Sequence, residues 1–169
     1  MEYLIVPMEP QHLDACVEIE RTAQDPWNAA QLAEELSCQM EGGASRIYLA
    51  VEPSTQQVVG LAAWQLAGDE ASLNTLTVDP AHRRRGIGRQ LLRQSLALLA
   101  QQGAAYAFLE VRHSNLAAQG LYESVGFSVQ GLRQNFYSAP REDALVMSCD
   151  GVQSFISAQQ EADDVYTGN

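Results

Sequence analysis

The chain has 169 residues, 46% of them hydrophobic, and it carries 21 acidic residues against 10 basic ones, none of which is lysine. This length and composition predict one globular domain, and the formal net charge of −11 argues against a nucleic-acid-binding protein. No stretch approaches the roughly 20 apolar residues of a membrane-spanning helix, and no basic and apolar N-terminal segment indicates a signal peptide. We therefore expect a cytoplasmic protein with no membrane partner.

The first half of the chain predicts a short strand, two helices and three further strands. After a strand over residues 3–6, apolar residues at helical spacing predict a helix from Gln11 to about Ala23. Asn28 is suited to cap a second helix, which ends at Gly42-Gly43. Three strands follow at residues 47–51, 58–66 and 71–78, and the short turns between them imply antiparallel pairing.

The second half alternates helices and strands. A long helix is expected over residues 86–102, a buried strand over 106–111, and a helix from Ser114 or Asn115 to near Gly126. The last strands are expected at residues 127–131, 135–137 and 144–148. The strand–helix–strand order from residue 71 to 111 implies a parallel pair with a right-handed crossover. The sequence therefore predicts a mixed α/β sheet with helices on both faces.

The last segment, residues 150–169, is polar and acidic. We expect it to form a loosely held tail outside a domain that covers residues 1–149.

Three scattered cysteines, Cys16, Cys38 and Cys149, fit reduced thiols better than a disulfide framework. Neither they nor the three histidines have the spacing of metal ligands, so no metal site is expected.

The charge is distributed unevenly along the chain. Residues 1–80 hold 13 acidic residues and two arginines, whereas residues 81–149 hold eight arginines and four acidic residues. An acidic first half would attract a cationic partner, although it could equally serve solubility alone.

The arginines gather in a loop, Arg83-Arg84-Arg85-Gly86-Ile87-Gly88-Arg89, between a strand and a helix. Gly86 and Gly88 let a ligand approach the backbone, and the amides and dipole of the helix N-terminus favour a phosphate group. The spacing matches neither the P-loop pattern nor the dinucleotide-binding Gly-x-Gly-x-x-Gly pattern. We interpret the loop as a pyrophosphate-binding site; a solvated helix cap is the alternative.

A second group of polar residues follows in the strand and helix after this loop. Glu110 lies in an otherwise apolar strand, where a carboxylate is costly unless it has a role or pairs with Arg112 or Arg133. Asn115 and Tyr122 are seven residues apart and project from one helix face. Tyr122 could also be an ordinary core tyrosine.

Six motifs in this order resemble the GNAT superfamily of N-acetyltransferases, and within it the ribosomal-protein-alanine N-acetyltransferases. The resemblance extends over residues 1 to about 149 and implies a mixed, mostly antiparallel seven-stranded sheet with one central parallel strand pair. The motifs are Pro26-Trp27, Arg83 to Arg89, Glu110-Val111-Arg112-x-Ser114-Asn115, Leu121-Tyr122-Glu123-Ser124-x-Gly126-Phe127, Arg133-x-Asn135-x-Tyr137 and Glu142-Asp143-Ala144-x-x-Met147.

The resemblance also implies a site for acetyl-CoA as co-substrate and a role for each matching residue. Glu110 matches the general base and Tyr122 the general acid, while Trp27 and Tyr137 match residues that flank the peptide entrance. The residues expected to hold the pantetheine arm are Leu76, Thr77, Val78 and Asn115, and those expected to hold the pyrophosphate are Arg84, Arg85, Gly86, Ile87, Gly88 and Arg89.

The function implied by the resemblance is acetylation of a basic protein N-terminus, specifically the N-terminal alanine of a small-subunit ribosomal protein. An acceptor amine must be neutral to attack, which at pH 7 costs about 1.4 kcal/mol for an α-amine and about 4.6 kcal/mol for a lysine. Lysine side chains and small-molecule amines remain alternative acceptors. The alternative to an enzyme is a non-catalytic module that binds acetyl-CoA or a partner. Phe136, Asn28 and Thr75 depart from the family pattern at positions that affect substrate choice.

Overall fold

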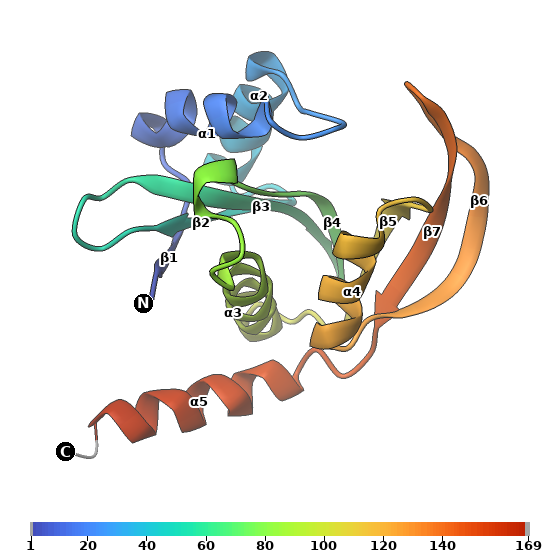
Figure 1. Cartoon of the computed structure of the whole chain (residues 1–169). Coiled ribbons are helices and arrows are strands. Elements are labelled where there is room, and N and C mark those ends of the chain that lie inside the picture. The colour runs from blue at the N-terminus through green and yellow to red at the C-terminus, as the bar shows by residue number, and fades with distance from the viewer. Residues whose placement is uncertain (1, 168–169) are drawn as a thin grey trace.

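The computed structural model describes residues 2–167 and contains one seven-stranded sheet (Figure 1). All neighbouring strands are antiparallel except β4 and β5, which are parallel. This confirms the predicted mixed sheet with one central parallel pair. The strands in spatial order are β1 (Leu4–Pro7), β2 (Ser45–Val51), β3 (Val58–Ala67), β4 (Glu70–Val78), β5 (Tyr106–Arg112), β7 (Arg141–Cys149) and β6 (Ser128–Ser138).

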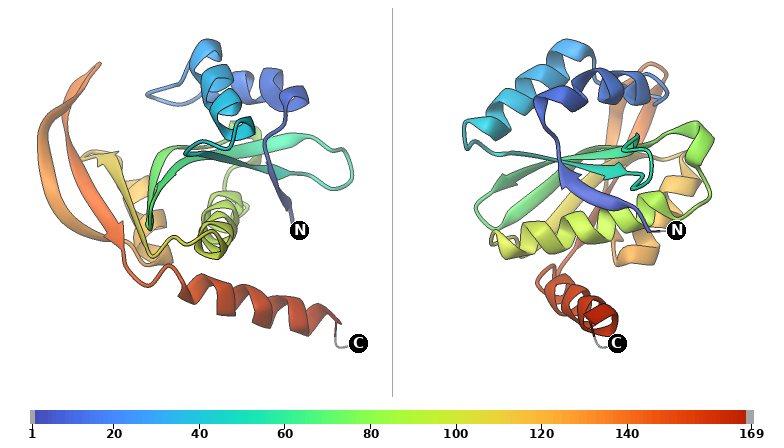
Figure 2. Two further views of the ribbon diagram at one scale, coloured as in Figure 1. Left: turned by 180° about the vertical axis from the view of Figure 1, so that it is seen from behind. Right: turned by 90° about the vertical axis from the view of Figure 1, so that its left-hand side faces the viewer.

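Helices cover both faces of the sheet, as Figures 1 and 2 show. On one face lie α1 (Leu13–Glu20) and α2 (Ala29–Met40), and on the other lie α3 (Ile87–Gln101) and α4 (Leu116–Val125). Short 3₁₀ turns, η1 (Pro10–His12) and η2 (Pro80–His82), precede α1 and the loop before α3. The helix predicted from Gln11 to about Ala23 is therefore shorter at both ends: its first residues belong to a 3₁₀ turn, and α1 ends at Glu20.

Two apolar clusters form the core, one on each face of the sheet. The buried residues of α3 recur at helical spacing on one side of the helix and pack in the cluster that contains Trp64, whose Nε1 donates to Ser95 Oγ over 3.2 Å. On the opposite face, Leu32 and Leu36 of α2 pack with the inward residues of β2 and β3. The first seven residues of β3, Val58 to Trp64, are buried on both faces of the sheet, which accounts for their apolar sequence without alternation.

The predicted cap of α2 is confirmed. The Asn28 side chain accepts a hydrogen bond from the backbone N–H of Gln31 over 2.8 Å, and Gln31 Oε1 accepts from the backbone N–H of Asn28 over 2.9 Å. This reciprocal pair satisfies two donors at the helix N-terminus. It also fixes the end of the loop over residues 21–28, here called the α1–α2 loop.

The parallel strands β4 and β5 pair over only part of their length. Pairing joins residues 70–73 to residues 106–109, and no pairing is seen beyond Leu73. At that point the register between β3 and β4 shifts, since Trp64 faces Leu73 while Ala63 faces Thr75. Such an irregularity bends a strand. The two strands therefore diverge, and the backbone of residues 74–78 on the β5 side is left without a strand partner.

The hairpin of β6 and β7 is longer than expected. The two short strands predicted at residues 127–131 and 135–137 are one strand, β6, with register shifts against β7 near Gly131 and between Arg133 and Tyr137. Asn135, at φ 52°, adopts a left-handed conformation that breaks the alternation expected of a strand. The hairpin rises toward the side of the sheet that carries α1 and α2 (Figure 1).

The expectation of a loose C-terminal tail is wrong for residues 154–167, which form helix α5 (Ser154–Thr167) on the outer side of α3 (Figure 2). Val152 is buried, and Phe155 and Ile156 pack against the core. Gln153 Nε2 donates to the carbonyls of Ala100 and Ala104 over 2.9 and 2.7 Å. These few apolar residues anchor a segment whose composition is otherwise polar.

Within the described part of the chain, no helix is both long enough and apolar enough to cross a bilayer.

Candidate active site

A groove opens where β4 and β5 diverge, and it has two connected parts. The wide cleft, about 680 Å³, lies beside the arginine-rich loop, residues 76–78 and α4. The narrow cleft, about 180 Å³, lies between the α1–α2 loop, β4, β5 and Tyr137. Seven residues line both parts: Ala23, Gln24, Leu76, Thr77, Asn115, Ala118 and Tyr122. A ligand bound in the wide cleft can therefore reach into the narrow one.

Backbone conformation shapes the loop at the wide cleft. Gly86 occupies the N-cap position of α3 at φ 75°, and Arg84 is also left-handed at φ 64°. A Cβ at Gly88 would lie 3.3 Å from Leu121 Cδ2, so a side chain there would crowd α4. The first N–H groups of a helix have no partner inside it and favour an anion. The loop thus presents free amide donors where the predicted pyrophosphate site lies.

The charge at the wide cleft suits a phosphate group. Arg83, Arg84 and Arg89 line it, and no acidic residue does among the residues that the structure describes. Those three arginines form no ion pair within residues 2–167. Arg85, which was also predicted to bind the cofactor, does not line the cleft.

The other residues predicted to contact the cofactor lie on the edge of β4. Leu76, Thr77 and Val78 line the wide cleft along the part of β4 that has no pairing with β5. Unpaired backbone groups of this kind can bind an extended, amide-containing ligand as an added strand. The amide groups of a pantetheine arm fit this edge.

Glu110 lies on β5 and lines the narrow cleft, with 23% of its side chain exposed. Of its two candidate ion-pair partners, the structure pairs it with Arg133, whose Nε lies 3.6 Å from Glu110 Oε1. Arg112 makes its ion pairs elsewhere. Glu110 is thus an accessible carboxylate rather than one locked in the core.

Tyr122, on α4, stands where the two clefts meet and is only 8% exposed. Its ring packs against Phe127 with centroids 5.9 Å apart, and its hydroxyl has no hydrogen-bond partner within residues 2–167. Burial raises the pKa of the Tyr122 phenol well above its ordinary value, and the nearby Tyr137 adds to the effect. Tyr122 is therefore a protonated, unpaired donor at neutral pH.

Tyr137 lines the narrow cleft from β6, and its predicted role at the peptide entrance stays a prediction. Burial, reinforced by the charges of Asp25 and Glu110, raises its pKa to about 12. Its ring also lies against a buried guanidinium, that of Arg112, at 4.3 Å from the ring centroid. Tyr137 is consequently held in place and uncharged at neutral pH.

Asn115 lines both clefts and also caps α4. Its Oδ1 accepts a hydrogen bond from the backbone N–H of Ala118 over 3.1 Å. Its side chain therefore has a structural task besides the predicted contact with pantetheine.

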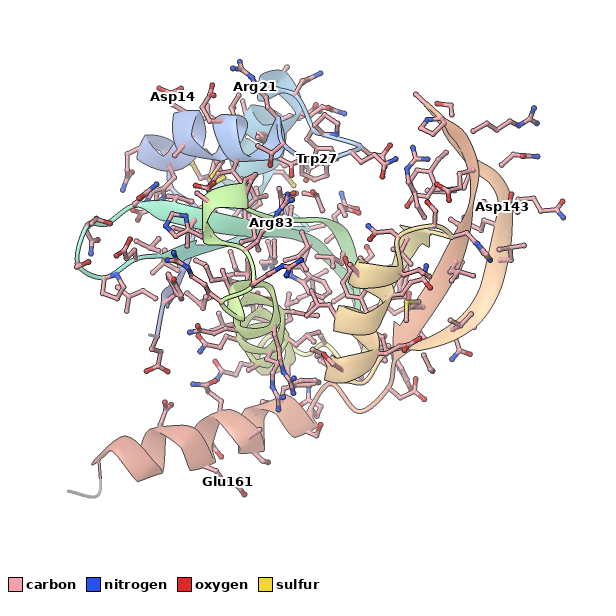
Figure 3. All side chains as sticks on the ribbon, viewed as in Figure 1. Asp14, Arg21, Trp27, Arg83, Asp143 and Glu161 are labelled. Carbon is pink, nitrogen blue, oxygen red and sulfur yellow. The ribbon has the colours of Figure 1, made fainter. Side chains whose placement is uncertain are left out.

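Trp27 lies on the α1–α2 side of the sheet (Figure 3) and packs against the core there. It lines neither cleft, whereas Ala23, Gln24 and Asp25 of the same loop do. Its predicted place at the peptide entrance stays a prediction.

Sequence reasoning missed Glu20, a fully buried carboxylate at the end of α1. Its Oε1 accepts hydrogen bonds from the hydroxyls of Thr75 and Thr77, and its Oε2 accepts from the backbone N–H of Trp27 over 2.8 Å. Glu20 thereby fastens the α1–α2 loop to β4. The sequence feature that could have identified Glu20 is its position: it lies three residues after Val17 and four after Cys16, on the apolar side of the helix.

Comparison with known proteins gives a consistent result. Residues 13–127 match the model of the acetyltransferase (GNAT) family. The [ribosomal protein bS18]-alanine N-acetyltransferase of Escherichia coli K12 is 43% identical over 94 residues, which span 54% of this chain and 64% of that enzyme. The enzyme of the same name from Haemophilus ducreyi is 33% identical over 150 residues, which span 86% of this chain and 98% of that protein.

Solved structures agree with the sequence comparison. The crystal structure of the ribosomal-protein-S18-alanine N-acetyltransferase from E. coli superposes with a TM-score of 0.78 at 34% identity, covering 88% of this chain and 94% of that one. The spermidine N-acetyltransferase of Vibrio cholerae in complex with CoA and spermine has a TM-score of 0.76 at 17% identity, covering 90% of this chain and 97% of that one. The second likeness concerns the fold alone.

Proposed function

Because the chain belongs to the acetyltransferase (GNAT) family, we propose that it transfers the acetyl group of acetyl-CoA to the N-terminal α-amine of a protein. The observation that carries this proposal is the continuous groove. It joins a phosphate-binding loop at one end to the Glu110 carboxylate at the other, and the unpaired hydroxyl of Tyr122 lies at the junction.

The wide cleft fits acetyl-CoA. The amides of residues 84–89 and the unpaired arginines would hold the pyrophosphate, and the free edge of β4 at residues 76–78 would hold the pantetheine arm. This arrangement directs the thioester toward the narrow cleft, where Tyr122 and Glu110 lie. Bound acetyl-CoA supplies an activated acyl group, so no covalent enzyme intermediate is needed.

The residues of the narrow cleft supply acid–base catalysis. Glu110, directly or through a water molecule, accepts a proton from the acceptor amine, which then forms the new C–N bond. A backbone N–H of β4, such as that of Val78, stabilises the oxyanion. Tyr122 donates its proton to the sulfur as the C–S bond breaks, and it is reprotonated from solvent. Burial keeps the Tyr122 hydroxyl protonated at neutral pH, because it raises the pKa of the phenol.

The acceptor that we propose is the N-terminal alanine of a basic ribosomal protein. Support comes from the two named relatives, which act on ribosomal protein bS18, and from the 13 acidic residues in the first 80 positions. An α-amine is also less costly to deprotonate at pH 7 than a lysine, by about 3 kcal/mol.

The test is CoA release from acetyl-CoA with a basic peptide that begins with alanine, with Glu110→Gln and Tyr122→Phe measured beside the wild type. Turnover by the wild type and losses of about 100-fold or more in both variants would support the proposal. Turnover with spermidine or a lysine side chain but not with the α-amine would change the acceptor. Binding of acetyl-CoA without turnover of any amine would favour a non-catalytic module.

A further inference from the structure

Arg112, at the end of β5, is a buried charge that the proposed reaction does not use. Only 2% of its side chain is exposed. Its Nε and Nη2 donate to the two carboxylate oxygens of Asp25 over 2.8 and 2.7 Å, and its Nη1 donates to Glu142 Oε1 over 3.1 Å. The carbonyls of Pro140 and Ala139 accept from Nη1 and Nη2 over 2.9 and 3.3 Å. The guanidinium is thus fully engaged by oxygen acceptors.

The partners of Arg112 come from two segments on opposite sides of the narrow cleft. Asp25 belongs to the α1–α2 loop, whereas Ala139 and Pro140 form the turn between β6 and β7, and Glu142 lies at the start of β7 just after it. Tyr137, just before that turn, lays its ring against the same guanidinium at 4.3 Å. Arg112 is therefore the point at which the loop, the turn and an entrance tyrosine are joined.

The α1–α2 loop consequently has an anchor on each of the diverging strands. Glu20 fastens it to β4 through the hydroxyls of Thr75 and Thr77, and Arg112 fastens it to β5 through Asp25. Between these anchors, Ala23 and Gln24 line both clefts. The loop spans the opening where β4 and β5 diverge, and its position depends on both anchors.

We propose that Arg112 is a positioning residue that sets the width of the acceptor entrance by fixing the α1–α2 loop against the β6–β7 turn. The inference rests on the proposed function, because it takes the narrow cleft as the place where the acceptor amine binds. Arg112 lines the narrow cleft and not the wide one. Its loss should therefore affect the acceptor and leave acetyl-CoA binding unchanged.

The geometry calls for arginine. A planar guanidinium can bind one carboxylate with two parallel hydrogen bonds and still donate to other oxygens, whereas a lysine ammonium offers a single point charge. Removing the cation would also leave the Asp25 and Glu142 carboxylates without their ion-pair partner beside Tyr137. A substitution of Asp25 should disturb folding less than one of Arg112, since 45% of the Asp25 side chain is exposed.

The experiment compares Asp25→Asn and Arg112→Lys with the wild type, using Arg141→Gln as the control. Arg141 is the first residue of β7, directly after the turn; it is exposed and makes no ion pair within residues 2–167. For each protein, kcat and KM are measured with the alanine-initiated peptide, and the Kd of acetyl-CoA is measured by calorimetry. Amide hydrogen exchange over residues 21–28 and 138–142 reports whether the two segments have loosened.

We expect the acceptor KM of Asp25→Asn to rise about tenfold, the effect of weakening one charge-assisted hydrogen bond. The Kd of acetyl-CoA should stay within about twofold of the wild type, and exchange should accelerate in both segments at once. The preference for alanine over a bulkier first residue should fall as well. Arg112→Lys should show the same pattern, and Arg141→Gln should show none of it.

Faster exchange with an unchanged acceptor KM and unchanged selectivity would overturn the inference, since the contacts would then be structural only. An equal loss of acetyl-CoA affinity would overturn it too, because Arg112 would then act on the whole groove. If the wild type acetylates a different amine, the same comparison is made with that acceptor. A wild type inactive toward every amine would overturn the proposed function and this inference with it.

Discussion

The hydroxyl of Tyr122 offers a direct test of catalysis, because its removal should change the reaction and little else. Tyr122→Phe deletes one oxygen atom and keeps the ring that packs against Phe127 at 5.9 Å. The hydroxyl has no hydrogen-bond partner within residues 2–167, so no internal hydrogen bond is lost. We expect the free energy of unfolding to change by less than about 1 kcal/mol.

The rate should fall much further than the stability. Loss of a general acid typically costs about 100-fold or more, which corresponds to about 2.7 kcal/mol in activation free energy. The assay is CoA release at saturating acetyl-CoA and peptide, with the Kd of acetyl-CoA and the Tm measured on the same preparations. We expect kcat to fall while Kd and Tm remain near the wild-type values.

The pH profile of the wild type adds a second readout. Burial raises the pKa of Tyr122 well above that of a free phenol, so the protonated donor persists as the pH rises. Activity should increase with pH as the acceptor amine loses its proton, and it should not decline from Tyr122 ionisation below about pH 10. Full activity in Tyr122→Phe, or a loss matched by an equal loss of folded protein, would refute the assignment.

Three further changes test the parts that support the site. Gly86→Ala places a side chain at φ 75° and should lower the free energy of unfolding by roughly 1–2 kcal/mol, which thermal unfolding would report. It should also weaken acetyl-CoA binding, measured by calorimetry. An unchanged affinity for acetyl-CoA would contradict the proposed role of the loop. Arg89→Gln should weaken acetyl-CoA binding and reduce its salt dependence with no change in the peptide KM, and a change confined to the peptide would be the contrary result. Glu20→Gln should lower the free energy of unfolding, measured in denaturant titrations, by about 1–3 kcal/mol. The amide NH₂ group of glutamine would face one of the donors that Glu20 now accepts from, so one of the three hydrogen bonds would be lost. An unchanged free energy of unfolding would show that these hydrogen bonds contribute little.

Much of the fold followed from local patterns. Hydrophobic periodicity and capping residues located the helices α1 to α4, and the Asn28 cap formed as expected. The parallel pairing of β4 and β5 was predictable, because a helix between two strands of one sheet usually forms a right-handed crossover that leaves the strands parallel. The loop of adjacent glycines and arginines was also evident in the sequence, and it lines the wide cleft; its binding of a phosphate group stays a prediction.

Other features depend on contacts between distant residues and could not be read locally. Arg112 and Asp25 are 87 positions apart, and the pattern of residues around each gives no sign of the other. The divergence of β4 from β5 coincides with a shift in the register between β3 and β4 opposite Ala63 and Trp64. No residue type at these positions predicts that shift. Helix α5 was missed because Val152, Phe155 and Ile156 supply its anchor within an otherwise polar segment.

The most direct test of the central claim is to locate the acetyl group that the protein transfers. A basic peptide that begins with alanine and contains one internal lysine is incubated with acetyl-CoA and the protein, and the product is fragmented by mass spectrometry. We expect the acetyl group on the N-terminal α-amine, with the lysine unmodified. Acetylation of the lysine alone, or of neither amine, would contradict the proposal of an N-terminal acetyltransferase.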